Sequence, residues 1–224
     1  MIFSLLLVIL CLKVAFVGPL RSIGFLSIDT QKIHFIDLND GFLFNSINLI
    51  SSQHLSSISL HNVSSNCLSS VGLTGLDAFN MVYLDDIHFG CMEFDFFESF
   101  HSVINITMRN SKLRHFEPYT FSNKSKLSFI DLSSNELRVI KTNTFFNLTV
   151  LHKISFANNK IELIEAKSFQ HLPSFDYCDL NGNQIMKLDS FAFYNLPLLR
   201  HVELSLVRYL DLENDSFVDL PSLR

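Results

Sequence analysis

The sequence lacks the motifs that mark common enzymes, metal sites and nucleic-acid binders. Its 9 histidines form no His-Glu-x-x-His pattern, and its 4 cysteines form no Cys-x-x-Cys pair, so the familiar zinc signatures are absent. No phosphate-binding glycine-rich loop and no Gly-x-Ser-x-Gly elbow occurs among only 7 glycines. The net charge of −5 is spread along the chain without a basic stripe. We therefore expect neither a cofactor nor a nucleic-acid partner.

Long apolar runs are scarce as well. The one candidate, residues 2–17, is broken by Lys13 and is shorter than the ~20 apolar residues that span a bilayer. Its position predicts a secretory signal over residues 1–24, with a cleavage site after Gly24. The alternative is a buried N-terminal strand. No second stretch of spanning length follows, so we expect an exported chain without a membrane span of its own.

Sequons for N-glycosylation agree with export. Five Asn-x-Ser/Thr triplets are present, at Asn62, Asn105, Asn123, Asn147 and Asn214. Such triplets also arise by chance in a chain rich in Asn and Ser, so they corroborate export without establishing it.

Apolar residues recur with a period of 24. One unit contains Leu127, Ile130, Leu132, Asn135, Leu137, Ile140, Phe145 and Leu148. The same series starts again at Leu151 and at Phe175, 24 residues later each time and without a gap. Internal repeats of this length indicate a solenoid.

The frame divides the chain into segments. Seven repeats of 24 residues cover residues 55–222, and residues 223–224 open a further one. Residues 25–54 should hold an N-terminal cap region and a first irregular repeat, in which Ile33, Ile36 and Leu38 match a 22-residue turn.

Each repeat offers one short strand and one deep aromatic residue. The alternation of Ile130 and Leu132 places both side chains on one face of a strand. Stacked repeats would pair these strands in parallel and bury each apolar face against its neighbours. A phenylalanine column should fill the outer half of the core, at Phe97, Phe121, Phe145, Phe169, Phe193 and Phe217.

The pattern L-x-x-L-x-L-x-x-N-x-L resembles the leucine-rich-repeat family, and the 24-residue unit with a late Phe resembles its extracellular class. The resemblance covers residues 33–224. It implies an α/β repeat fold: a curved horseshoe with a parallel sheet on the concave face and an irregular or short-helical convex side. Toll-type receptor ectodomains, chaoptin-like adhesion proteins and Slit-like secreted binders have such repeats. The resemblance implies extracellular recognition of a protein or microbial ligand, with a structural adhesion or matrix role as the alternative.

The family's asparagine follows the strand in three repeats, at Asn135, Asn159 and Asn183. An inward amide there can satisfy backbone groups of the tight turn. Elsewhere these turns must find other partners, because the equivalent residues are Val63, Ile87, Ser111 and Val207.

Two cysteines share a position in adjacent repeats. Cys67 and Cys91 are 24 residues apart, and strands ~4.8 Å apart lie within the Cα separation that a disulfide accepts. A disulfide and two separate thiols are both compatible with this spacing. Cys178 replaces a core leucine and should be a buried thiol.

The residues between the inward positions should form the ligand-binding face. In the later repeats they combine aromatic, basic and acidic groups, and the predicted site consists of Phe129, Asp131, Lys153, Tyr177, Asp179, His201 and Glu203. A glycan on Asn105 would cover the middle of this face.

Carboxylates do gather in the sequence without indicating catalysis. Asp176 joins Asp179 and Glu203 on neighbouring repeats, but an open sheet cannot desolvate carboxylates enough to tune them, so we expect no enzyme. The pair Asp85-Asp86 should be solvated.

The last repeat leaves apolar residues such as Leu212 uncovered, which predicts self-association through this end.

Overall fold

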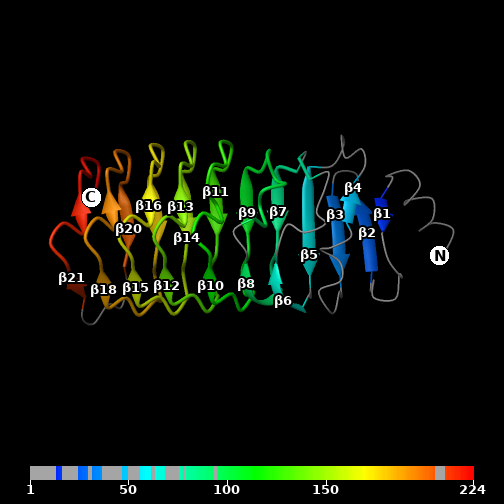
Figure 1. The fold of residues 1–224 in the computed structure, drawn as a ribbon, viewed down its shortest axis with the longest axis horizontal. Helices are drawn as coiled ribbons and strands as arrows, with labels where there is room; N and C mark the ends of the chain where they lie inside the picture. The colour runs from blue at the N-terminus through cyan, green and yellow to red at the C-terminus, as the bar shows by residue number, and fades with distance from the viewer. Residues whose placement is uncertain are drawn as a thin grey trace.

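The computed structural model is a solenoid of stacked repeats. It describes residues 14–16, 25–29, 32–36, 47–49, 56–61, 64–68, 76–77, 79–92, 95–204 and 210–224. From β5 to β21 the turns of the chain lie side by side in one row (Figure 1).

One face of the row is a nine-stranded sheet, in the order β2-β3-β5-β7-β9-β11-β14-β17-β20. The strands are β2 (Phe25–Asp29), β3 (Lys32–Ile36), β5 (Ser57–His61), β7 (Met81–Tyr83), β9 (Asn105–Thr107), β11 (Phe129–Asp131), β14 (Lys153–Ser155), β17 (Tyr177–Asp179) and β20 (His201–Glu203). From Ser57 onward each strand pairs in parallel with the next at an offset of 24 residues, as in Ser57↔Met81. The predicted period and parallel stacking are confirmed.

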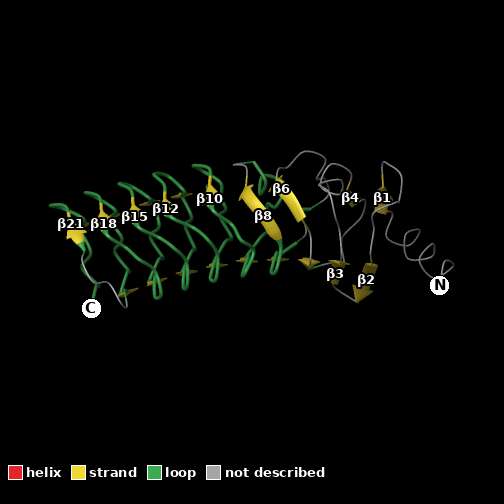
Figure 2. Cartoon of the chain, turned by 90° about the horizontal axis from the view of Figure 1, so that it is seen from below, coloured by secondary structure: helices red, strands yellow, loops and turns green. Residues whose placement is uncertain are grey.

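Short strands also run along the opposite side of the solenoid (Figure 2). One sheet contains β6 (Ser64–Leu68), β8 (His88–Met92) and β10 (His115–Phe116). A second contains β12 (Val139–Ile140), β15 (Leu163–Ile164), β18 (Lys187–Leu188) and β21 (Asp211–Leu212), and a third contains β13 (Phe145–Phe146), β16 (Phe169–Gln170), β19 (Phe193–Tyr194) and β22 (Phe217–Val218). The described residues contain no helix, so parallel ladders of short strands stand where we expected irregular or short-helical structure.

Left-handed corners join the strands within each repeat. They recur every 24 residues in three columns: Asp86, Asn110, Ser134, Asn158 and Gly182; Tyr119, Asn143, Lys167, Phe191 and Asp215; Asn123, Asn147, His171, Asn195 and Asp219. Asn, Asp and Gly tolerate this conformation best. At Ser134 and Asn158 the left-handed conformation turns the backbone amide toward the next repeat, where each amide donates to a carbonyl at 2.8 Å. The corners therefore link each turn of the solenoid to its neighbour.

The amino-terminal part differs from the predicted frame. Strand β3 pairs Ile33 with Ile58, whereas the 22-residue frame placed Ile36 at that point. Strand β2 then folds back antiparallel on β3, so a hairpin forms the edge of the sheet. Within the predicted signal segment, β1 (Val14–Phe16) pairs antiparallel with β4 (Ile47–Leu49). This pairing agrees with the alternative of an N-terminal strand, and the signal remains a prediction.

The phenylalanine column forms the outer half of the core, as predicted. Phe97, Phe121, Phe145, Phe169 and Phe193 are fully buried, and Phe217 is half-buried. Consecutive rings lie 5.1–5.5 Å apart between centroids. Such contacts contribute about 0.5–1.5 kcal/mol each beyond burial of their area.

The buried asparagines hold the turns in the predicted way. The Asn159 side-chain nitrogen donates to the carbonyls of Leu132 and Phe156, both at 2.9 Å, and its oxygen accepts from the Leu137 amide at 3.1 Å. Where asparagine is missing, Ser111 takes over: its hydroxyl donates to the Leu84 carbonyl at 2.7 Å. The expected other partner is thus found for one of the four exceptional turns.

Candidate ligand-binding face

Strands β11, β14, β17 and β20 place four predicted site residues in one row on the exposed side of the sheet. We call Phe129, Lys153, Tyr177 and His201 the face row. Backbone register pairs each member with the next. His201 is exposed and the other three are half-buried, while the residue that follows each of them points into the core or toward it. The alternation of a strand therefore produces this row directly from the repeat.

Tyr177 is the centre of the face row. The Lys153 ammonium nitrogen lies 4.5 Å above the centroid of its ring, within the range of a cation–π contact. The His201 ring lies on its other side, at 6.2 Å between centroids. Burial, together with the nearby charges of Asp179 and Glu203, raises the pKa of the Tyr177 hydroxyl. The phenol therefore stays protonated and can donate a hydrogen bond.

The predicted carboxylates form a second row beside the first, with Asp179 and Glu203 in register. Two of them hold their own turns. Asp131 accepts from the Ser133 amide at 3.0 Å, and Asp179 accepts from the Asn181 amide at 3.1 Å. Glu203 is half-buried. The structure thus brings all seven predicted site residues onto one surface, but gives two carboxylates a local structural task as well.

The expectation of a solvated pair at Asp85-Asp86 is wrong for Asp85. This residue is 8% exposed, and both of its carboxylate oxygens accept hydrogen bonds from Arg109. The backbone amide of Arg109 donates at 2.8 Å, its Nε at 3.1 Å and a terminal guanidinium nitrogen at 2.6 Å. The hydrogen bond with Asp85, followed by its charge, raises the pKa of Arg109. Asp85 and Arg109 are 24 residues apart and hence at equivalent positions of adjacent repeats. This spacing of opposite charges is the sequence feature that could have predicted the pair.

The described residues contain neither a cluster of metal-ligating side chains nor a membrane-spanning helix. Nowhere do three or more His, Cys, Asp or Glu side chains come together as a metal would require. Among the same residues, no helix has the length and apolar character needed to cross a membrane.

Comparison with known families agrees with the repeat geometry. Residues 125–185 match the family described as leucine rich repeat, and these residues include the asparagine turns and three strands of the face row. These residues are leucine-rich repeats, and the fold of the chain is that of a leucine-rich-repeat solenoid. A comparison with curated proteins finds no matching sequence.

A solved structure extends the likeness beyond residues 125–185. It is titled as the Toll–Spatzle complex, a molecular hub in Drosophila development and innate immunity. One chain of that complex shares 16% identity with this protein at a TM-score of 0.59. At this identity the likeness is one of fold. The match covers 81% of this chain and 28% of the other, so this chain spans less than a third of the length of that one.

The sequons differ in accessibility. Asn123, Asn147 and Asn214 are exposed, whereas Asn105 is half-buried on β9 with its amide nitrogen 3.3 Å from the Met81 sulfur. Asn62 lies outside the described residues. Glycosylation at the three exposed sites remains a prediction, and it would leave the face row open.

The cysteines lie in two different parts of the solenoid. Cys67 and Cys91 are register partners on β6 and β8, as the 24-residue spacing predicts, but their side chains lie outside the described part of the structure and the bridge stays a prediction. Cys178 is a free, fully buried cysteine of the core. Burial raises the pKa of its thiol, so it stays protonated and unreactive.

Proposed function

We propose that this leucine-rich-repeat protein binds an extracellular protein ligand through the face row, as part of a Toll-like or related receptor ectodomain. The observation that carries the proposal is the contact of Tyr177 with Lys153 on one side and His201 on the other. A half-exposed aromatic side chain held between a lysine ammonium and a second ring is a typical binding hot spot.

The charges around the face row favour a protein as ligand. One row supplies basic and aromatic groups, and the adjacent row supplies Asp131, Asp179 and Glu203. A ligand surface with both acidic and basic side chains complements this pattern, because paired charges of both signs fix its register on the sheet. The similar fold in the Toll–Spatzle complex supports the choice of a receptor-type function.

The test uses two matched double variants of the chain. Phe129→Ala with Tyr177→Ala removes two rings from the face row. Phe191→Ala with Tyr194→Ala is the control, since it removes the same residue types from the opposite side, where they are 37% and 38% exposed. Both chains are probed by biolayer interferometry against an array of purified secreted proteins and ectodomains. For a protein that binds the unaltered chain, the face-row variant should lose about 2 kcal/mol, roughly thirtyfold in Kd, with an unchanged melting curve.

The control variant also tests a second candidate, a structural adhesion role on the opposite side. Phe191 and Tyr194 pack edge to face at 5.4 Å and are both exposed, so they form a smaller aromatic surface away from the sheet. Loss of binding in the Phe191/Tyr194 variant alone would favour adhesion through this side and contradict a binding face on the sheet.

A further inference from the structure

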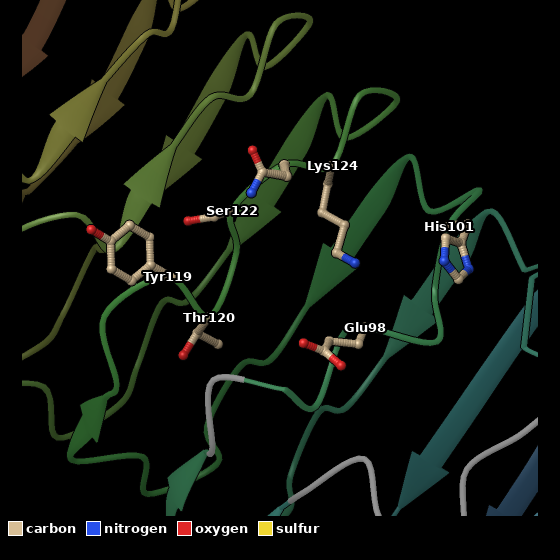
Figure 3. Close-up of a pocket in the computed structure, with 7 residues that line it drawn as sticks. Glu98, His101, Tyr119, Thr120, Ser122 and Lys124 are labelled. Atoms are coloured by element: carbon tan, nitrogen blue, oxygen red, sulfur yellow. The ribbon is translucent and has the colours of Figure 1, made fainter.

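A polar pocket opens on the side of the solenoid away from the face row. Its volume is about 450 Å³, within the usual range for small-ligand sites. It lies between two repeats and is lined by Glu98, His101, Tyr119, Thr120, Ser122, Asn123 and Lys124 (Figure 3). We call it the outer pocket. The outer pocket lies in the repeats that precede β13, the first strand of the third sheet. It is therefore a feature of this boundary and is not predicted by the repeat pattern.

Opposite charges face one another in the outer pocket without forming an ion pair. Lys124 and Glu98 extend toward each other from neighbouring repeats (Figure 3). The ion pairs within 4.0 Å in the described part of the chain do not include this pair. Burial lowers the pKa of Lys124, and the charge of Glu98 opposes that shift. A donor and an acceptor thus remain available on opposite sides of the space.

Hydroxyl groups form another part of the wall. Ser122 is only 8% exposed, and its side-chain oxygen is buried without a hydrogen-bond partner. An unpaired buried hydroxyl costs free energy and calls for an explanation. A serine side chain has three staggered positions, so this one can turn toward a ligand without giving up a bond. The Tyr119 hydroxyl accepts from the Asn143 amide nitrogen at 2.8 Å, and its own proton can still be donated.

We propose that the outer pocket binds a neutral saccharide. A sugar hydroxyl both donates and accepts, so it can bridge the Lys124 ammonium and the Glu98 carboxylate. An anionic ligand would meet Glu98, and a cationic ligand would meet Lys124. The Tyr119 ring is 49% exposed and offers an apolar surface beside these polar groups, a combination that suits a molecule with C–H faces and hydroxyl edges.

The saccharide can come from two sources. Asn123 lines the pocket and begins a sequon with Ser125, so a glycan attached there would start at the wall. Asn147, the sequon one repeat later, donates from its amide nitrogen to the Asn123 side-chain oxygen at 2.8 Å. A free saccharide, or one carried by a partner, is the other source.

The experiment is saturation-transfer difference NMR on the full chain secreted from eukaryotic cells. The probes are diacetylchitobiose, mannobiose and lactose, with a sulfated disaccharide as the charged comparison. At least one neutral probe should show transfer to this chain or to its Ser125→Ala variant, and in the chain that binds, Glu98→Gln and Tyr119→Ala should each lower the affinity tenfold or more. Ser122→Ala should weaken binding without lowering the melting temperature, since no hydrogen bond is lost. Tyr194→Ala, on the same side of the solenoid, should bind as the unaltered chain does.

A Ser125→Ala chain, which lacks the Asn123 sequon, separates the two sources. If an attached glycan fills the outer pocket, free disaccharides bind only to this variant. If the ligand is a separate saccharide, they bind to both chains. The proposal is overturned if neither chain shows transfer from a neutral probe, if the sulfated probe binds more tightly, or if Tyr119→Ala and Tyr194→Ala behave alike.

Discussion

The repeats that carry asparagine differ from those that precede them in how their turns are satisfied. In the later repeats a single amide side chain such as Asn159 serves two carbonyls and one backbone amide. In the earlier repeat the single proton of the Ser111 hydroxyl is shared between the carbonyls of Leu84 and Arg109, at 2.7 and 3.0 Å, and its oxygen accepts from the Ile87 amide at 3.3 Å. The same turn can therefore be built with a shorter side chain that donates one proton in place of the two that an asparagine amide donates. The third sheet, which begins at β13, is confined to the later repeats.

Removing one ring of the phenylalanine column should have the largest effect, and the same effect in both regions. Phe145→Ala and Phe97→Ala each empty a fully buried position, which costs about 3–5 kcal/mol of unfolding free energy. The chain has no tryptophan, so urea unfolding is followed by circular dichroism. A loss below 1 kcal/mol for Phe97→Ala alone would show that the column does not continue into the earlier repeats.

The turn side chains should distinguish the regions. Asn159→Ala removes three hydrogen bonds and leaves the Leu137 amide without its side-chain partner, while the carbonyls of Leu132 and Phe156 each keep a bond from a neighbouring asparagine. The loss should be about 2–4 kcal/mol, whereas Ser111→Ala should cost about 1–2 kcal/mol. The same urea titration measures both. Equal losses would mean that hydrogen-bond number at this turn does not set stability, which contradicts the comparison drawn between the two regions.

The charged pair of the earlier region should matter less. Arg109→Ala leaves the buried carboxylate of Asp85 with fewer donors, but the arginine is largely exposed, with 55% side-chain accessibility. We expect a loss of about 1 kcal/mol. Arg138→Ala is the matched control, because its ion pair with Glu162 is exposed on both sides, and it should change the free energy of unfolding by less than half as much.

The smallest effect concerns a surface carboxylate of the later region. Hydrogen bonds from Lys160 and Arg114 lower the pKa of Glu136. The unfolded chain holds this proton more tightly, so the contribution to stability is present above the ordinary value of about 4.5 and is lost as the pH falls through the lower folded value. Lys160→Gln should raise the pKa of Glu136 in an NMR titration. An unchanged titration curve would show that the ion pair is absent in solution.

Much of this architecture could be predicted from the sequence, because the contacts between two adjacent repeats recur between every following pair of repeats. The 24-residue offset alone places Phe129, Lys153, Tyr177 and His201 in register. The same rule gives the phenylalanine column and the asparagine turns. Contacts across adjacent repeats, such as Asp85 with Arg109, follow the same offset, whereas Asp85 and Asp86 are neighbours only along the chain.

Other features depend on departures from the repeat and were not predictable. The register of Ile33 with Ile58 comes from an irregular first turn, where apolar spacing fits more than one alignment. The outer pocket forms next to the first strand of the third sheet, β13. Its shape therefore depends on side chains that occur at this one place and do not recur in every repeat. The short outer strands were missed because two extended residues carry no periodicity of their own.

The face row is tested most directly by hydroxyl-radical footprinting of the chain with and without a protein that binds it. Mass spectrometry reads the oxidation of individual side chains, and the structure provides rings on both sides of the solenoid. The account predicts that the bound partner protects Phe129, Tyr177 and His201 while Phe191 and Tyr194 are oxidised as before. Protection of Phe191 and Tyr194, with unchanged oxidation of Tyr177, would contradict it.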